Sequence, residues 1–168
     1  KHGDFFRFGR ALFAAGFRAG DLVHNAFSYH FTPAGLMMDM AAQAVGCTVF
    51  PAGVGQTEMQ VTAIADLKPR GYAGTPSFLK IFLEKAQELG ADVSSLKIAS
   101  VSGEALLPAV REYLKGRGIE VRQCYGTADL GLIAYESEPL VGLIVDEGVI
   151  VEIVRPGTGE PVADGEVG

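Results

Sequence analysis

The feature that most constrains the fold of this 168-residue chain is a repeated alternation of short apolar runs with longer helical patterns. Each run has the length of a buried strand and ends in turn-forming residues. The predicted strands are, in chain order, Leu22–Phe27, Cys47–Phe50, Gly71–Gly74, Lys97–Val101 and Ile119–Cys124. Strands that alternate with helices of about ten residues predict right-handed crossovers. We therefore expect an α/β fold, a doubly wound parallel sheet with helices on both faces.

Start and stop signals place the helices between these strands. Thr32-Pro33 and Thr75-Pro76 each put a capping hydroxyl before a proline at the first helical position, where its missing N–H costs nothing. Helices are expected from Pro33 to Gly46, over Thr57–Leu67, from Pro76 to Gly90 and over Pro108–Lys115. Helical spacing predicts buried side chains at Met59, Val61, Ile64, Leu67, Phe78, Leu79, Phe82, Leu83, Ala86 and Leu89.

The pattern changes near Ser137, which predicts two parts. Residues 1–136 are expected to form the central part of an α/β domain, and residues 137–168 the beginning of a small β-rich subdomain. In the second part Val149–Val154 alternates like a strand, and Pro156–Pro161 predicts a sharp turn. The chain starts without methionine and stops within a turn-and-strand pattern, so we expect it to be a piece of a larger enzyme.

Composition argues against several partners. The formal net charge is −6 and no Lys/Arg cluster breaks the acidic balance, which disfavours nucleic acid. No apolar run approaches the ~20 residues that span a bilayer, so no membrane span is expected. Cys47 and Cys124 lie far apart without metal-ligand spacing, and we interpret them as small buried hydrophobes of a cytoplasmic protein.

Ligands of doubly wound sheets bind at the carboxyl ends of the strands. The loops expected there are Ser28–Thr32, Pro51–Gln56, Thr75–Ser77, Ser102–Ala105 and Tyr125–Asp129. Neither a Gly-x4-Gly-Lys-Ser/Thr loop nor a Gly-x-Ser-x-Gly elbow occurs. Gly53-Val54-Gly55 follows a strand, but Glu58 stands where a dinucleotide fingerprint needs its third glycine.

Two of these loops combine residue types that suit a nucleotide. They read Ser102-Gly103-Glu104-Ala105-Leu106 and Tyr125-Gly126-Thr127-Ala128-Asp129. A glycine lets the backbone approach a flat ligand, and an aromatic ring can stack on a base. A hydroxyl can bind phosphate, and a carboxylate can hold Mg²⁺.

In this order and spacing, the two loops resemble those of the acyl-adenylate-forming enzymes, and within them the phenylacetate–CoA ligase family. The first is similar to the family's Gly-Ala-Glu-Pro adenine-binding segment, and the second to its Tyr-Gly-x-Thr/Ser-Glu segment. Gly46–Gly53, Gly74–Phe78, Gly159–Pro161 and Gly165–Gly168 also resemble family segments. The resemblance covers the chain from about Gly20 to its end, and the shared order of the motifs supports it more than any single motif.

The resemblance implies roles for individual residues. The implied nucleotide-binding residues are Ser102, Gly103, Glu104, Ala105, Tyr125, Gly126 and Thr127. Among them, Tyr125 would pack on the adenine and Gly126 would allow close approach. Thr127 and Asp129 would be catalytic, Thr127 at the α-phosphate and Asp129 as the Mg²⁺ ligand. Tyr29, His30 and Phe31 would border the acyl pocket.

Departures from the family pattern leave alternatives open. Asp129 is one methylene shorter than the usual glutamate, Ser102 replaces a glycine, and Ala105-Leu106 replaces the usual ending. Glu104 and Asp129 are alternatively helix caps or solvent-facing carboxylates. His30 is alternatively a hydrogen-bonded loop residue. We expect His24, within a strand, to be structural.

The resemblance implies that the parent enzyme activates a carboxylic acid, with an aryl or arylacetic acid as the first expectation. ATP and Mg²⁺ would give an acyl-adenylate, and coenzyme A would be the acyl acceptor. The family's phosphate loop would precede residue 1 and its catalytic lysine would follow residue 168, so this chain alone should be inactive. The sequence leaves open an amine or carrier protein as acceptor, a non-catalytic nucleotide-binding or interaction module, and a homodimer.

Overall fold

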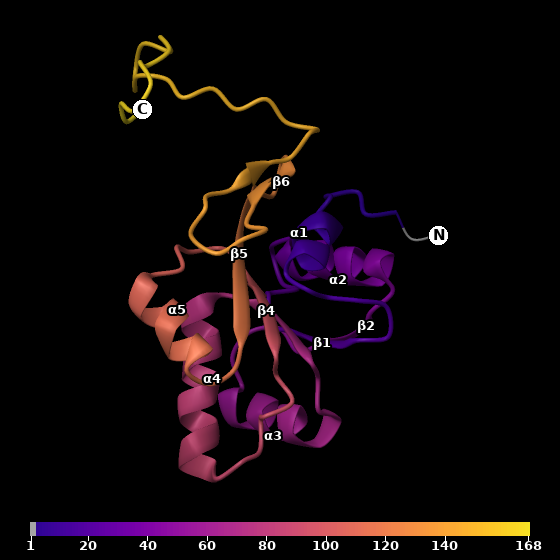
Figure 1. Cartoon of the computed structure of the whole chain (residues 1–168). Helices are drawn as coiled ribbons and strands as arrows, with labels where there is room; N and C mark the ends of the chain where they lie inside the picture. The colour runs from indigo at the N-terminus through magenta and orange to yellow at the C-terminus, as the bar shows by residue number, and fades with distance from the viewer. Residues whose placement is uncertain (1–2) are drawn as a thin grey trace.

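The computed structural model describes residues 3–168 and contains a seven-stranded sheet in the order β2-β1-β3-β4-β5-β6-β7 (Figure 1). The strands are β1 Leu22–Asn25, β2 Thr48–Pro51, β3 Gly71–Gly74, β4 Ile98–Val101, β5 Glu120–Thr127, β6 Gly131–Tyr135 and β7 Ile144–Val145. β1 to β5 pair in parallel, whereas β6 and β7 are antiparallel. The predicted doubly wound parallel sheet is confirmed for β1 to β5, and the whole sheet is mixed.

Helices cover both faces of this sheet (Figure 1). They are α1 Gly9–Ala14, α2 Ala34–Val45, α3 Thr57–Leu67, α4 Pro76–Leu89 and α5 Pro108–Lys115. Side chains of a strand alternate between faces, and β4 shows the consequence. Ile98 packs in a cluster with α1 and α2, while Ala99 and Val101 pack in a second cluster with α3, α4 and α5. β4, in the middle of the sheet, is therefore buried on both sides.

Local capping explains where the helices begin and end. The Thr75 hydroxyl accepts a hydrogen bond from the Phe78 N–H at 3.3 Å, as expected for the start of α4. α2 begins one residue later than predicted, and the Thr32 hydroxyl accepts from the Ala34 N–H at 3.3 Å. Gly46 ends α2 with a φ of 95°, a left-handed conformation that favours glycine.

Three apolar side chains that helical spacing predicted to be buried lie at the surface. Met59 is 69% exposed, Leu67 48% and Leu89 49%. The inward face of α3 is formed by Gln60, Val61 and Ile64, so the polar Gln60 takes the place that we had expected for Met59. Leu67 and Leu89 are the last residues of α3 and α4.

The region after residue 124 differs most from the prediction. β5 continues through Thr127 and pairs with β6, a strand that the sequence analysis missed, with an irregular register between Tyr125 and Gly126. Tyr125, Gly126 and Thr127 therefore lie in a strand, and only residues 128–130 form the turn. Tyr125, Gly126 and Thr127 have the composition of a loop, but pairing with the buried apolar strand β6 makes them part of β5.

The strand predicted over Val149–Val154 does not form. Its last residue makes an isolated bridge with Pro161. The division of the chain after residue 136 stays a prediction.

Gly71, at the start of β3, has no room for a side chain. A Cβ atom there would lie 2.3 Å from Cε1 of Phe17, a fully buried ring. β3 lies between β1 and β4 in the parallel sheet, so a shift of this strand would disturb both neighbours.

We expect Gly71→Ala to lower the free energy of unfolding by about 1–3 kcal/mol, because the added methyl group overpacks the Phe17 site. Combining it with Phe17→Leu should recover part of that loss, which a double-mutant cycle in urea would measure. Gly3→Ala is the control, since nothing lies within 4 Å of its Cβ position. Additive effects of the two substitutions would contradict the contact.

Candidate functional site

The order in which the strands are connected predicts where along the carboxyl ends of the sheet a ligand site lies. β1 leads through α2 to β2 on one side, whereas β3 leads through α4 to β4 on the other. Crevices form at the carboxyl ends of strands where the winding reverses, which is here between β1 and β3. The predicted site residues follow β1 and β4 or lie at the end of β5, on this edge.

The loop after β4 and the end of β5 together line a hollow of about 400 Å³, which we call the β4–β5 hollow. Its lining residues are Ser102, Gly103, Glu104, Ala105, Gln123, Cys124, Tyr125, Gly126 and Leu143. Small-molecule sites have volumes of roughly 300–1,000 Å³. Most of the predicted nucleotide-binding residues therefore share one hollow of suitable size.

Gln123 and Leu143 also line this hollow and were missed by the sequence analysis. Gln123 lies just before the second motif, so its strand position could have suggested it. Leu143 belongs to a segment without a motif, and it reaches the hollow only because the chain returns after β6.

Tyr125 and Gly126 differ in their surroundings: the first is exposed, whereas the second is tightly packed. The Tyr125 side chain is 55% exposed, so its ring is available to a flat ligand. A Cβ atom on Gly126 would lie 2.5 Å from Cζ of Phe8 and 2.6 Å from the Gly131 carbonyl oxygen. Packing inside the protein thus requires glycine at position 126 whether or not a ligand approaches it.

The loop after β4 is held against the loop after β3. Gly103 has a φ of 85°, and its Cβ position would lie 3.5 Å from Cγ2 of Thr75. The Glu104 carboxylate accepts a hydrogen bond from the Ser77 N–H at 2.8 Å, in the first turn of α4. The helix-capping interpretation of Glu104 is confirmed, and its role toward a nucleotide stays a prediction.

Thr127 and Asp129 lie outside the β4–β5 hollow. The Thr127 hydroxyl accepts from the Leu130 N–H at 3.1 Å across the turn. Asp129 is exposed and lines another hollow, of about 530 Å³, with Phe5 and Arg7. Residues 3–168 contain no group of three or more His, Cys, Asp or Glu that could hold a metal ion. The metal-binding role of Asp129 stays a prediction.

The turn that contains Asp129 is held by the N-terminal segment. Nη2 of Arg7 donates to the carbonyl oxygens of Leu130 at 2.7 Å and Leu132 at 3.0 Å, while its Nε donates to Asp146 at 2.8 Å. The Leu132 N–H also donates to the Phe6 carbonyl oxygen at 2.8 Å.

Tyr29 and His30 border a different hollow, of about 390 Å³, between the loops after β1 and β2; we call it the β1–β2 hollow. The Tyr29 hydroxyl accepts from Nδ2 of Asn25 at 2.8 Å. Burial and the nearby Asp39 carboxylate raise the pKa of Tyr29 well above its ordinary value, so the phenol stays protonated. Phe31 is fully exposed and does not line this hollow.

A buried polar pair that the sequence analysis missed shapes the β1–β2 hollow. Nε2 of Gln60 donates to the carbonyl oxygens of Gly53 at 3.0 Å and Gly55 at 2.7 Å. Its Oε1 consequently faces Nε2 of His24 at 2.7 Å, which assigns the His24 proton to Nε2. His24 is fully buried, as its structural interpretation requires, and burial lowers its pKa.

The stability of the chain should depend on His24 at acid pH. The unfolded state binds a proton on this histidine below about pH 6.5, whereas the buried ring resists protonation because its pKa is lowered. Stability should therefore fall with decreasing pH, by at most about 1.4 kcal/mol per pH unit from this group. Urea unfolding from about pH 8 to about pH 5 should show this slope in wild type and a weaker one in His24→Gln. Parallel profiles would contradict the assignment.

Neither cysteine is suited to nucleophilic chemistry. Burial raises the pKa of Cys47 and of Cys124 to about 11, so both thiols stay protonated at neutral pH. Both are buried and free, which confirms their interpretation as small hydrophobes.

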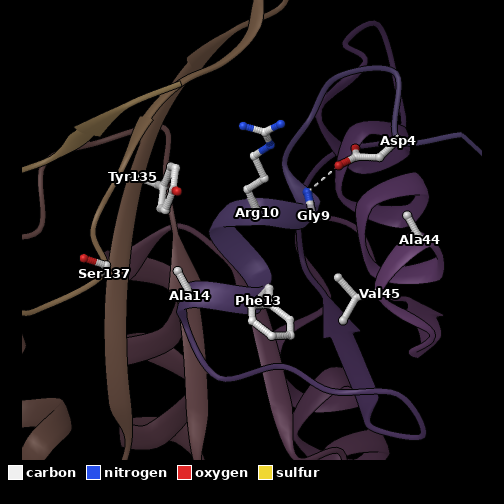
Figure 2. A pocket seen from close by; sticks show the side chains of 9 residues that line it. All are labelled: Asp4, Gly9, Arg10, Phe13, Ala14, Ala44, Val45, Tyr135 and Ser137. Atoms are coloured by element: carbon white, nitrogen blue, oxygen red, sulfur yellow. Dashed lines mark hydrogen bonds between the residues drawn. The ribbon is translucent and has the colours of Figure 1, made fainter. Parts of the chain in front are cut away.

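A hollow of about 600 Å³ lies between α1, α2 and β6, away from the predicted site residues (Figure 2). Arg10 lines this hollow and extends from α1 away from Phe13 and Ala14 (Figure 2). Its guanidinium pairs with Glu147 and lies 3.6 Å from the buried Asp146 carboxylate. Asp4 accepts from the Gly9 N–H at 2.7 Å. The charge of Arg10 is already balanced, so we assign no ligand here.

Comparison with known proteins identifies the family. The model of the AMP-binding enzyme family matches residues 2–168. The chain belongs to the AMP-binding enzymes. Phenylacetate-coenzyme A ligase of Aromatoleum evansii is 34% identical over 166 residues, which are 95% of this chain and 38% of that enzyme. The enzyme of the same name from Escherichia coli K12 is 35% identical over 167 residues, again 95% of this chain and 38% of the relative. This AMP-binding chain thus spans about 38% of the length of these relatives.

Solved structures give the same result for the fold. A 2-hydroxyisobutyryl-CoA ligase in complex with 2-HIB-AMP and CoA matches with a TM-score of 0.84 at 23% identity, over 94% of this chain and 37% of that one. The anthranilate CoA ligase AuaEII in complex with anthranoyl-AMP matches with a TM-score of 0.76 at 20% identity, over 97% of this chain and 33% of that one. The predicted resemblance is confirmed for this AMP-binding enzyme. Within residues 3–168, no helix has the length and hydropathy needed to cross a membrane.

Proposed function

We propose that the protein containing this chain is an acid–CoA ligase. It joins a carboxylic acid to the AMP part of ATP with release of pyrophosphate, and then transfers the acyl group to coenzyme A with release of AMP. The observation that supports this proposal is the β4–β5 hollow, which gathers the loop after β4 and the exposed ring of Tyr125 at one edge of the sheet. An aryl or arylacetic acid is proposed as substrate, because two relatives are phenylacetate-coenzyme A ligases.

In this proposal the β4–β5 hollow binds the adenosine part of ATP. The Tyr125 ring packs on the adenine, and residues 102–105 line its edge and the ribose side. The Glu104 carboxylate keeps this loop against α4 through its bond to Ser77. The β1–β2 hollow, with Tyr29 and His30, receives the acyl group. The carboxylate of the acid attacks the α-phosphorus and pyrophosphate leaves.

The α-phosphate is proposed to lie near the turn after β5. Mg²⁺ held by Asp129 would stabilise the charge that develops on the phosphate oxygens. Counted from Tyr125, the Thr/Ser position of the family motif falls on Ala128, and Thr127 takes the variable position. The Thr127 hydroxyl accepts from the Leu130 N–H, so its own proton is still free to donate to a phosphate oxygen.

This chain spans about 38% of its relatives, so we propose that it binds nucleotide but needs the remainder of the enzyme for turnover. An amine or carrier protein as acyl acceptor, a cytoplasmic location and a homodimer stay predictions. A non-catalytic nucleotide-binding module is the second candidate, and the observation that favours it is Asp129 in place of glutamate.

Acid-dependent exchange of pyrophosphate into ATP tests the proposal in the full-length protein, with a panel of aryl, arylacetic and aliphatic acids. Asp129→Asn should lower kcat/KM on the order of 10²-fold, because the carboxylate stabilises transition-state charge through the metal. Asp129→Glu should retain activity. Asp66→Asn, at an exposed carboxylate on α3, is the matched control.

Exchange with no acid of the panel would favour the non-catalytic module over the ligase. Unchanged kcat/KM in Asp129→Asn would remove the proposed metal role from this residue and leave the ligase proposal standing.

A further inference from the structure

Glu136, the residue that follows β6, is a carboxylate whose side chain is only 1% exposed. Its ion-pair partner is Arg111 of α5, whose side chain is 7% exposed, and Nη2 of the arginine lies 2.8 Å from Oε1 and 3.0 Å from Oε2. Buried pairs of this kind are weak evidence for stability, because apolar residues of similar volume often stabilise a fold equally well. Nε of Arg111 is moreover buried without a hydrogen-bond partner. Stability alone therefore does not explain why this buried pair is present.

The first partner of Glu136 connects it to the loop after β4. α5 starts at Pro108, three residues after Ala105, and places Arg111 in its first turn. Nη1 of Arg111 also donates to the Val121 carbonyl oxygen in β5 at 3.1 Å. The arginine thus fixes the helix that follows Ser102–Ala105 to both β5 and Glu136.

The other partners of Glu136 belong to the remaining walls of the β4–β5 hollow. Oε2 accepts from the Gln123 N–H at 3.2 Å, and the Glu136 N–H donates to the Gln123 carbonyl oxygen at 2.9 Å. Oε1 accepts from the Leu140 N–H at 3.1 Å, three residues before Leu143. Both Gln123 and Leu143 line the hollow.

We propose that Glu136, with Arg111, is a positioning pair that holds the three walls of the β4–β5 hollow together and so sets the affinity for an adenine nucleotide. A carboxylate has about four acceptor sites. The contacts with Arg111, Gln123 and Leu140 occupy these sites, so Glu136 acts through the walls and does not touch the ligand. The inference rests on the proposed function, because it takes the hollow to be the nucleotide site.

Glu136→Gln tests the pair with almost no change in volume. An amide puts two N–H donors where one carboxylate oxygen accepted, so either the Gln123 or the Leu140 contact must be lost, whichever way the amide turns. Glu136→Asp is the second variant; it keeps the charge and shortens the side chain by one methylene. Arg70→Met is the matched control, because it breaks the Arg70–Asp21 ion pair (2.7 Å) next to the amino end of β3, at the opposite edge of the sheet.

The full-length proteins are compared by calorimetric Kd for ATP, by KM for ATP and for the acid, and by Tm. In both Glu136 variants, Kd and KM for ATP should rise on the order of 10- to 100-fold, with an unchanged KM for the acid. Arg70→Met should leave Kd for ATP unchanged.

A lowered Tm with wild-type Kd for ATP, measured well below the unfolding midpoint, would overturn the inference and reduce the pair to a stabilising contact. If Glu136→Gln does not fold, Glu136→Asp decides by the same criterion. A wild-type protein that binds no ATP would overturn the proposed function itself, and the inference with it. Wild-type binding with unaffected variants would overturn the inference alone.

Discussion

The parallel pairing of β1 to β5 is the constraint on which the rest of this structure depends. Parallel strands need a crossover connection, and the helices of those connections bury both faces of the sheet. Each crossover returns the chain to the amino ends of the strands. The loops that follow the five strands therefore all lie at the carboxyl ends. The β1–β2 and β4–β5 hollows both lie where these carboxyl ends meet.

Much of this architecture could be predicted from the sequence, because its signals are local. Thr75-Pro76 gives a capping hydroxyl and a fixed φ at one point of the chain, and α4 starts there. Apolar spacing found Val61 and Ile64, but it placed Met59 inside, because Gln60 is buried by bonds to distant groups. The end of β5 was mispredicted for a similar reason. Tyr125–Thr127 alone have the composition of a turn, and they form a strand because they pair with β6, which is close in sequence but was not recognised.

The same limit applies to the candidate site. Motif order placed Ser102–Ala105 and Tyr125-Gly126 in one hollow, which the structure contains. It gave no indication of Arg111 or Glu136, which meet through the pairing of β5 with β6. It also missed Leu143, which reaches the hollow when the chain turns back after β6. The buried pairs His24–Gln60 and Arg111–Glu136 have in common that each joins a core position to a loop or strand end lining a hollow. Polar residues within this core thus contact the residues that line both hollows.

The contacts of Arg7 give the first residues of the chain an importance that their position in the sequence does not suggest. Arg7 and Phe6 hydrogen-bond to Leu130 and Leu132, so a short N-terminal ribbon supports a turn more than 120 residues away. A minimal version of this domain that started at α1 would keep every strand of the sheet. It would nevertheless lack the hydrogen bonds that Arg7 donates to the carbonyl oxygens of Leu130 and Leu132, next to Asp129. Phe6 and Arg7 therefore belong to the structural surroundings of Asp129, although they lie outside every strand of the sheet.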